Sequence, residues 1–76
     1  MTDSVRKRSV TLDGHRTSLS IEQPFWDALK DLAAEQEISL SALIQAIDHD
    51  RDDPDVNLSG ALRVYVLRAL QRKLSS

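Results

Sequence analysis

Hydroxyl and guanidinium side chains alternate with other residues near the start of the chain. Arg16, Ser18 and Ser20 are separated by Thr17 and Leu19, and alternation with a period of two is typical of a half-buried β-strand. The alternate members of such a strand lie on one face. Together they would form a hydrogen-bonding surface of donors and acceptors, although an ordinary solvated strand face shows the same pattern.

An Asp13-Gly14 pair interrupts the alternating run, which extends over residues 8–21. Asp-Gly between alternating segments predicts a β-hairpin with a two-residue type I′ turn. A turn closed by Leu12 and His15 fixes the register and predicts the facing pairs Thr11–Arg16, Val10–Thr17 and Ser9–Ser18. The apolar face would hold Val10, Leu12, Thr17, Leu19 and Ile21, and the polar face Ser9, Thr11, Arg16, Ser18 and Ser20.

Three helices are predicted after the β region, over residues 24–36, 39–50 and 58–74. Pro24 suits a first helical position, Ser39 is a good N-cap, and Asn57 can cap the last helix. The acidic stretch that begins at Asp50 predicts a loop, because carboxylates oppose the macrodipole at a helix C-terminus and Pro54 cannot continue a helix. Apolar residues at helical spacing in the last helix are Leu58, Leu62, Tyr65, Val66, Ala69, Leu70 and Leu74.

The length of 76 residues corresponds to one domain, residues 1–76. A chain this short buries only about 60% of the surface that its unfolded form exposes. It has no cysteine and only two histidines, so oligomerisation is the remaining route to added stability. A strand and two helices would also leave Leu43 and Ile47 exposed unless a second subunit covered them, which predicts an intertwined homodimer.

Charge is distributed unevenly although the net charge is only −2. Residues 1–20 carry a balance of +2, from Arg6, Lys7, Arg8 and Arg16 against Asp3 and Asp13, whereas residues 48–55 carry −4, from five aspartates against Arg51. We expect residues 1–7 to form a flexible basic arm, and we expect Arg6, Lys7 and Arg8 to contact phosphates. No apolar run approaches the ~20 residues that span a bilayer, and no secretory signal is present, so we expect a cytoplasmic protein.

Catalysis and metal binding have little support in the sequence. His49 has no second histidine at ligand spacing, and the aspartates around it lack the glycine and glutamate of a calcium loop. No glycine-rich phosphate loop and no nucleophile elbow is present. We therefore expect a binding module without cofactor or metal, and not an enzyme.

The segment from residue 16 to residue 51 resembles the ribbon-helix-helix family of bacterial and phage repressors, the MetJ/Arc class. The resemblance is carried by Arg16-Thr17-Ser18-Leu19-Ser20-Ile21, by Phe25-Trp26-Asp27-Ala28-Leu29 and by Ile38-Ser39-Leu40-Ser41-Ala42-Leu43-Ile44. With a preceding hairpin strand and a third helix, the chain is similar to a small bacterial subfamily. The resemblance implies a mainly α fold, with a strand or hairpin before the helices, that assembles as an intertwined dimer.

The resemblance also implies a function for particular residues. Antiparallel strands of two chains would enter the major groove of double-stranded DNA, where Arg16, Ser18 and Ser20 would read bases. The backbone N–H groups of Ser39, Leu40 and Ser41, at the start of the second helix, would hold a phosphate. The dimer core would contain Leu19, Ile21, Trp26, Leu29, Leu43, Ile44 and Ile47. The implied function is sequence-specific DNA binding by a transcriptional regulator.

Two departures from the family pattern leave an alternative open. Glu37 occupies the inter-helix position that usually holds glycine, near the expected phosphate anchor. A hairpin also adds a strand on each side of the ribbon, and four strands would not fit a groove about 12 Å wide. The alternative is an antitoxin-like dimerisation module that binds another protein through its third helix or its acidic loop and has no DNA recognition of its own.

Overall fold

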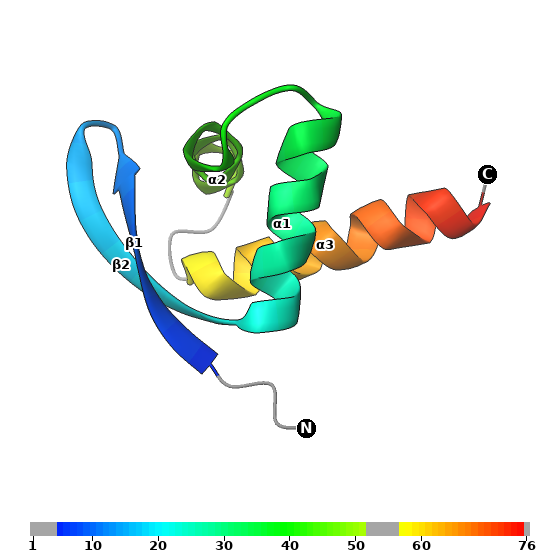
Figure 1. The fold of residues 1–76 in the computed structure, drawn as a ribbon, viewed down its shortest axis with the longest axis horizontal. Helices are drawn as coiled ribbons and strands as arrows, with labels where there is room; N and C mark the ends of the chain where they lie inside the picture. The colour runs from blue at the N-terminus through cyan, green and yellow to red at the C-terminus, as the bar shows by residue number, and fades with distance from the viewer. Residues whose placement is uncertain (1–4, 52–56, 76) are drawn as a thin grey trace.

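The computed structural model describes residues 5–51 and 57–75 of the chain. In this part, two strands precede three helices (Figure 1): β1 (Val5–Leu12), β2 (His15–Glu22), α1 (Gln23–Glu35), α2 (Leu40–His49) and α3 (Leu58–Ser75). The order of a hairpin and then three helices confirms the order of elements expected from the sequence. Most of the expected acidic loop and the first four residues of the expected arm lie outside the described residues.

The β-hairpin has the predicted register. Its turn has positive φ at both central residues, 52° at Asp13 and 78° at Gly14, as a type I′ turn requires. Val10 faces Thr17, Thr11 faces Arg16 and Ser9 faces Ser18. The pairing continues to Val5 opposite Glu22, so residues 5–7 form part of β1 and the expectation of a flexible arm is wrong for them. Their backbone groups find partners because β2 is long enough to face them.

The connection between α1 and α2 is built from backbone hydrogen bonds. The N–H of Ile38 donates to the carbonyl of Ala33 at 3.0 Å, and the N–H of Glu37 donates to the carbonyl of Ala34 at 3.1 Å. These two bonds define a Schellman motif, whose C′ residue adopts the left-handed conformation. Glu37 has a φ of 58°, so a glutamate holds a conformation that glycine adopts with the least strain.

One hydrophobic core joins the hairpin to all three helices. The inner face of the hairpin contributes Val10, Leu12, Leu19 and Ile21, and these side chains pack with buried residues of the helices. Figure 1 shows the hairpin along one side of the helices, while the C-terminal half of α3 extends away from it. The opposite face of the hairpin is left to solvent.

Leu43 and Ile47 do not need a second subunit to be buried, contrary to our expectation. Their side chains are 2% and 7% exposed in the single chain. The third helix provides the cover, because it packs against α1 and α2 and contributes Leu62 and Val66 to the same core. The described residues contain no helix with both the length and the apolar character that a bilayer crossing requires.

Candidate nucleic-acid interface

The outward face of the hairpin contains all three expected base-reading residues. Arg16, Ser18 and Ser20 are exposed and lie at alternate positions of β2. Residues that face each other across an antiparallel pair share a face, and the facing residues on β1 are Thr11, Ser9 and Lys7. The face therefore carries two cations and four hydroxyl groups. We had expected Lys7 only in an arm; the register from the Asp-Gly turn would place it here once the strand is extended to Val5.

The three N-terminal basic residues do not act as one group in the structure. Lys7 joins the outward face, whereas Arg6 and Arg8 face Ile21 and Leu19 on the inner side of the hairpin. The guanidinium of Arg8 lies 4.9 Å from the centre of the Trp26 ring and donates to Gln23 Oε1 at 2.6 Å. Such a cation–π contact stabilises a half-buried arginine. Arg8 therefore contacts α1 from the inner side of the hairpin and does not lie on the outward face.

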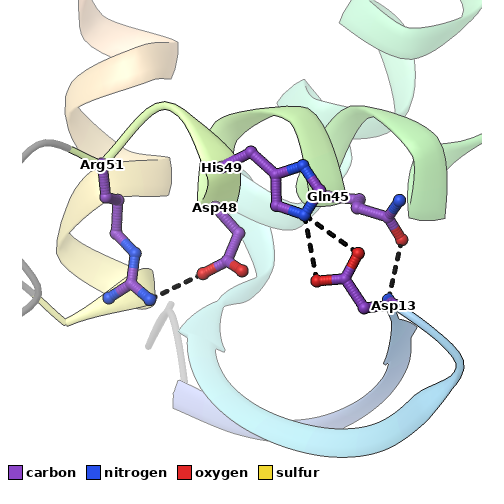
Figure 2. Close-up of polar contacts among 5 residues, drawn as sticks. All are labelled: Asp13, Gln45, Asp48, His49 and Arg51. Atoms are coloured by element: carbon purple, nitrogen blue, oxygen red, sulfur yellow. Dashed lines mark hydrogen bonds and ion pairs between the residues drawn. The ribbon is translucent and has the colours of Figure 1, made fainter.

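The turn of the hairpin is attached to the second half of α2 (Figure 2). The backbone N–H of Asp13 donates to Gln45 Oε1 at 3.0 Å. His49 Nε2 lies 2.9 Å from each carboxylate oxygen of Asp13, and hydrogen bonding to this carboxylate raises the pKa of His49. These contacts hold the turn against the helix on the side away from the polar face.

The other end of the hairpin is attached to α3. Ser59 Oγ donates to the backbone carbonyl of Ser20 at 2.7 Å, and Arg63 Nε pairs with Glu22 Oε1 at 2.9 Å. The guanidinium of Arg63 also lies 6.0 Å from the centre of the Phe25 ring. Its hydrogen bond lowers the pKa of Glu22, which keeps this carboxylate charged and paired at the end of the outward face.

A small cluster of possible metal ligands lies beside the turn. Oxygen or nitrogen atoms of Asp13, Asp48 and His49 all lie within 4.8 Å of one another. In Figure 2, Asp13 pairs with His49, and Asp48 pairs with Arg51. The second pair has a distance of 2.6 Å from Arg51 to Asp48 Oδ1. These ion pairs explain why the three side chains lie close together, and the pair between Asp13 and His49 links the hairpin to α2.

The N-terminus of α2 has the backbone geometry expected of an anion site. Ser39 is the N-cap, and its hydroxyl accepts a hydrogen bond from the N–H of Ala42 at 3.0 Å. The N–H groups of Leu40 and Ser41 have no partner within the helix by geometry, and they add to the positive end of the helix dipole. The carboxylate of Glu37, two residues before the cap, opposes an anion at this point.

Residues expected in the dimer core lie instead in the core of one chain. Leu19, Ile21, Leu29, Leu43, Ile44 and Ile47 are buried, and Trp26 is half-buried under Arg8. Exposed large apolar side chains lie mainly on α3, at Leu67 (53%), Leu70 (50%) and Leu74 (86%). Their spacing of three and four residues places them on one side of the helix. The sequence predicted one broad apolar surface on this helix, whereas the structure divides it into a buried and an exposed part.

A ribbon that presents cations and hydroxyls, followed by a helix with an exposed N-terminus, defines the class of protein. The family described as ribbon-helix-helix domain matches residues 5–70, and the chain belongs to this family. Its members typically bind DNA and dimerise, and the fold is generally one of regulators and not of enzymes.

A solved structure of similar fold is that of an uncharacterized protein from Bordetella pertussis Tohama I. It is 33% identical to the chain, with a TM-score of 0.81 over 95% of the chain. The chain spans 60% of the length of that protein's chain. None of the curated proteins compared with the chain matches it.

Proposed function

We propose that the protein is a sequence-specific DNA-binding regulator of transcription that acts as a homodimer in the bacterial cytoplasm. The observation that carries the proposal is the outward face of the hairpin, on which Arg16, Ser18 and Ser20 are exposed together. A two-stranded ribbon fits the major groove, where a guanidinium can bind guanine O6 and N7 and hydroxyls can bind several base edges. The N-terminus of α2, with Ser39, Leu40 and Ser41, is the proposed phosphate contact.

A random-duplex selection tests this function. The purified protein and its Arg16→Ala variant select bound sequences at two salt concentrations, and Arg68→Ala on α3 serves as a control that removes the same charge away from the hairpin. We expect an approximately two-fold symmetric site, because a symmetric dimer presents the same surface twice. Arg16→Ala should weaken the free energy of DNA binding by about 1–3 kcal/mol and relax the base preference at one position of each half-site. A wild-type protein that enriches no sequence while remaining folded would contradict the proposal.

A second candidate function is supported by the exposed apolar side of α3. Leu67, Leu70 and Leu74 offer another protein a nonpolar stripe along one side of the helix. In this candidate the third helix binds a partner protein, and the chain has no DNA recognition of its own. The double substitution Leu67→Gln and Leu70→Gln distinguishes the two: it should abolish partner binding in this candidate and leave the DNA selection unchanged in the first.

A further inference from the structure

The two strands of the hairpin carry the same order of residue types. In each strand a cation is followed, after one intervening residue, by a serine, an aliphatic residue, a hydroxyl residue and a second aliphatic residue. The two segments are Lys7-Arg8-Ser9-Val10-Thr11-Leu12 and Arg16-Thr17-Ser18-Leu19-Ser20-Ile21. They are offset by nine residues, and the repeat is therefore a property of the whole hairpin.

The register makes this repeat symmetric in space. Ser9 faces its own equivalent, Ser18, at the centre, and the pairs Lys7–Ser20 and Thr11–Arg16 are exchanged by the offset. A local two-fold axis therefore passes between Ser9 and Ser18, perpendicular to the ribbon. The two cations lie at diagonal ends of the outward face, about 13 Å apart along the strands at 3.3 Å per residue.

The structure holds β1 in this ribbon at several points. Val10 and Leu12 are buried in the core, so removal of β1 would expose apolar surface to water. Asp13 forms hydrogen bonds with Gln45 and His49 of α2. If β1 left the hairpin, the turn would change its conformation and these contacts would be lost. The strand thus remains beside β2 in the folded chain.

The other edge of β2 is partly covered. In a hairpin closed at Leu12 and His15, alternate pairs such as Lys7–Ser20 direct their backbone groups outward. The outward carbonyl of Ser20 accepts a hydrogen bond from Ser59, which a strand from another chain would have to displace. A sheet that kept β1 and added two strands of a partner would also span about 14 Å of backbone, at 4.8 Å per strand, against a groove about 12 Å wide.

We propose that the DNA-reading ribbon is complete within one chain, and that Lys7, Ser9 and Thr11 read the duplex together with Arg16, Ser18 and Ser20. This inference rests on the proposed function and deepens it, because it assigns three further contact residues and one hairpin to each half-site. The bound half-site itself should then be nearly symmetric. The guanidinium of Arg16 contacts guanine at two atoms and Lys7 contacts it as a point charge, so selection should be stricter on the side of Arg16.

Substitutions on β1 test the assignment with matched controls. Thr11→Ala removes a hydroxyl from the outward face, and Thr17→Ala removes the same group from an exposed position on the inner side of the hairpin. Lys7→Ala is matched by Lys30→Ala on the exposed side of α1. We expect Thr11→Ala and Lys7→Ala to lower affinity for the selected site by roughly 5-fold to 100-fold and to change base preference, whereas both controls leave affinity and preference unchanged.

A reversible covalent lock tests whether β1 stays in place during binding. The chain has no cysteine, so the pair Val5→Cys and Glu22→Cys, which face each other at the open end of the hairpin, would form a unique disulfide. Directly opposed residues of this kind lie within the distance that a disulfide bridges. The reduced form of the same variant is the control, because both forms lack the Glu22 carboxylate.

We expect the oxidised and reduced forms to bind the selected duplex with equal affinity. Loss of binding on oxidation and recovery on reduction would overturn the inference, since the ribbon would then require β1 to leave. Unchanged affinity and preference in Thr11→Ala and Lys7→Ala would overturn it as well, while the proposed function would stand on the β2 residues. A wild-type protein that selects no duplex would overturn both.

Discussion

The hairpin and α3 are both two-faced elements, but their outer faces differ in chemistry. Each packs one apolar face into the common core, through Leu19 and Ile21 on β2 and through Leu62 and Val66 on α3. The hairpin presents hydroxyls and cations to solvent, whereas α3 presents exposed leucines such as Leu67. One chain of 76 residues therefore offers a surface suited to nucleic acid and another suited to protein.

This difference indicates where each activity should be sought. A polar strand face contributes little to folding, because its groups are hydrated before and after the chain folds. An exposed apolar helix face contributes little either, until a partner covers it. Substitutions on the two outer faces should therefore change binding, and substitutions on the inner faces should change stability.

The largest effect is expected on the inner face of the hairpin. Ile21→Ala removes a fully buried side chain and should lower the free energy of unfolding by about 2–5 kcal/mol, from lost burial and the cavity that remains. Ser18→Ala on the outer face should change it by no more than about 0.5 kcal/mol. Urea denaturation followed by circular dichroism measures both. Equal losses for the two variants would break the contrast between the faces.

The turns with positive φ extend the comparison to smaller effects. The hairpin turn has Asp13 and Gly14 in this conformation, whereas the turn before α2 has Glu37 alone, at φ 58°. Glu37→Gly should raise the free energy of unfolding by about 1 kcal/mol, because the left-handed conformation costs a residue with a Cβ roughly that amount. Glu37→Gln removes the charge and keeps the strain, so it should leave stability unchanged while improving DNA affinity at low salt. If Glu37→Gly does not raise the free energy of unfolding, the backbone at Glu37 is not strained.

Substitution on the outer side of α3 should leave the fold almost unchanged. Leu67→Gln replaces a half-exposed side chain and should alter the free energy of unfolding of the isolated chain by about 0.5 kcal/mol or less. Leu62→Ala, on the buried side of the same helix, is the comparison variant and should lower the free energy of unfolding by about 2–5 kcal/mol, as Ile21→Ala does. Sedimentation of the Leu67 variant shows in addition whether this side joins two copies of the chain.

The smallest effects are expected from the ion pairs at the two ends of the hairpin, and they have opposite pH dependence. The Asp13 carboxylate raises the pKa of His49, so this pair stabilises the fold below about pH 6.5, the ordinary histidine value, and loses its effect as the pH rises through the raised pKa. Arg63 lowers the pKa of Glu22, so that pair stabilises the fold above the ordinary glutamate pKa and loses its effect as the pH falls through the lowered one.

Thermal unfolding from about pH 2 to pH 9 separates the two pairs, because the effect of the Glu22 pair is lost only below the ordinary glutamate pKa. His49→Gln should flatten the decline of stability on the alkaline side of pH 6.5, and Arg63→Gln should flatten the decline on the acid side. Parallel curves for the wild type and both variants would show that neither end of the hairpin depends on its ion pair.

Local sequence signals predicted a large part of the site. The Asp13-Gly14 turn and the alternation around it gave the register and the outward positions of Arg16 and Ser18, and both are confirmed. Ser39 was predicted as a cap of α2, and its hydroxyl has that role. These features depend on hydrogen bonds and steric limits within a few residues, which is why the sequence alone determined them.

Tertiary structure decided the features that depend on contacts between distant segments. Arg8 contacts the ring of Trp26 on α1, whereas Lys7 lies on the outward face. The alternation along the strand separates these two cations, but it does not predict that the strand reaches Val5 or that Arg8 contacts α1. The burial of Leu43 by α3 likewise depends on a helix that begins fifteen residues later. Apolar periodicity predicts that a helix has a buried side, but only the packing of whole elements determines which chain provides the cover.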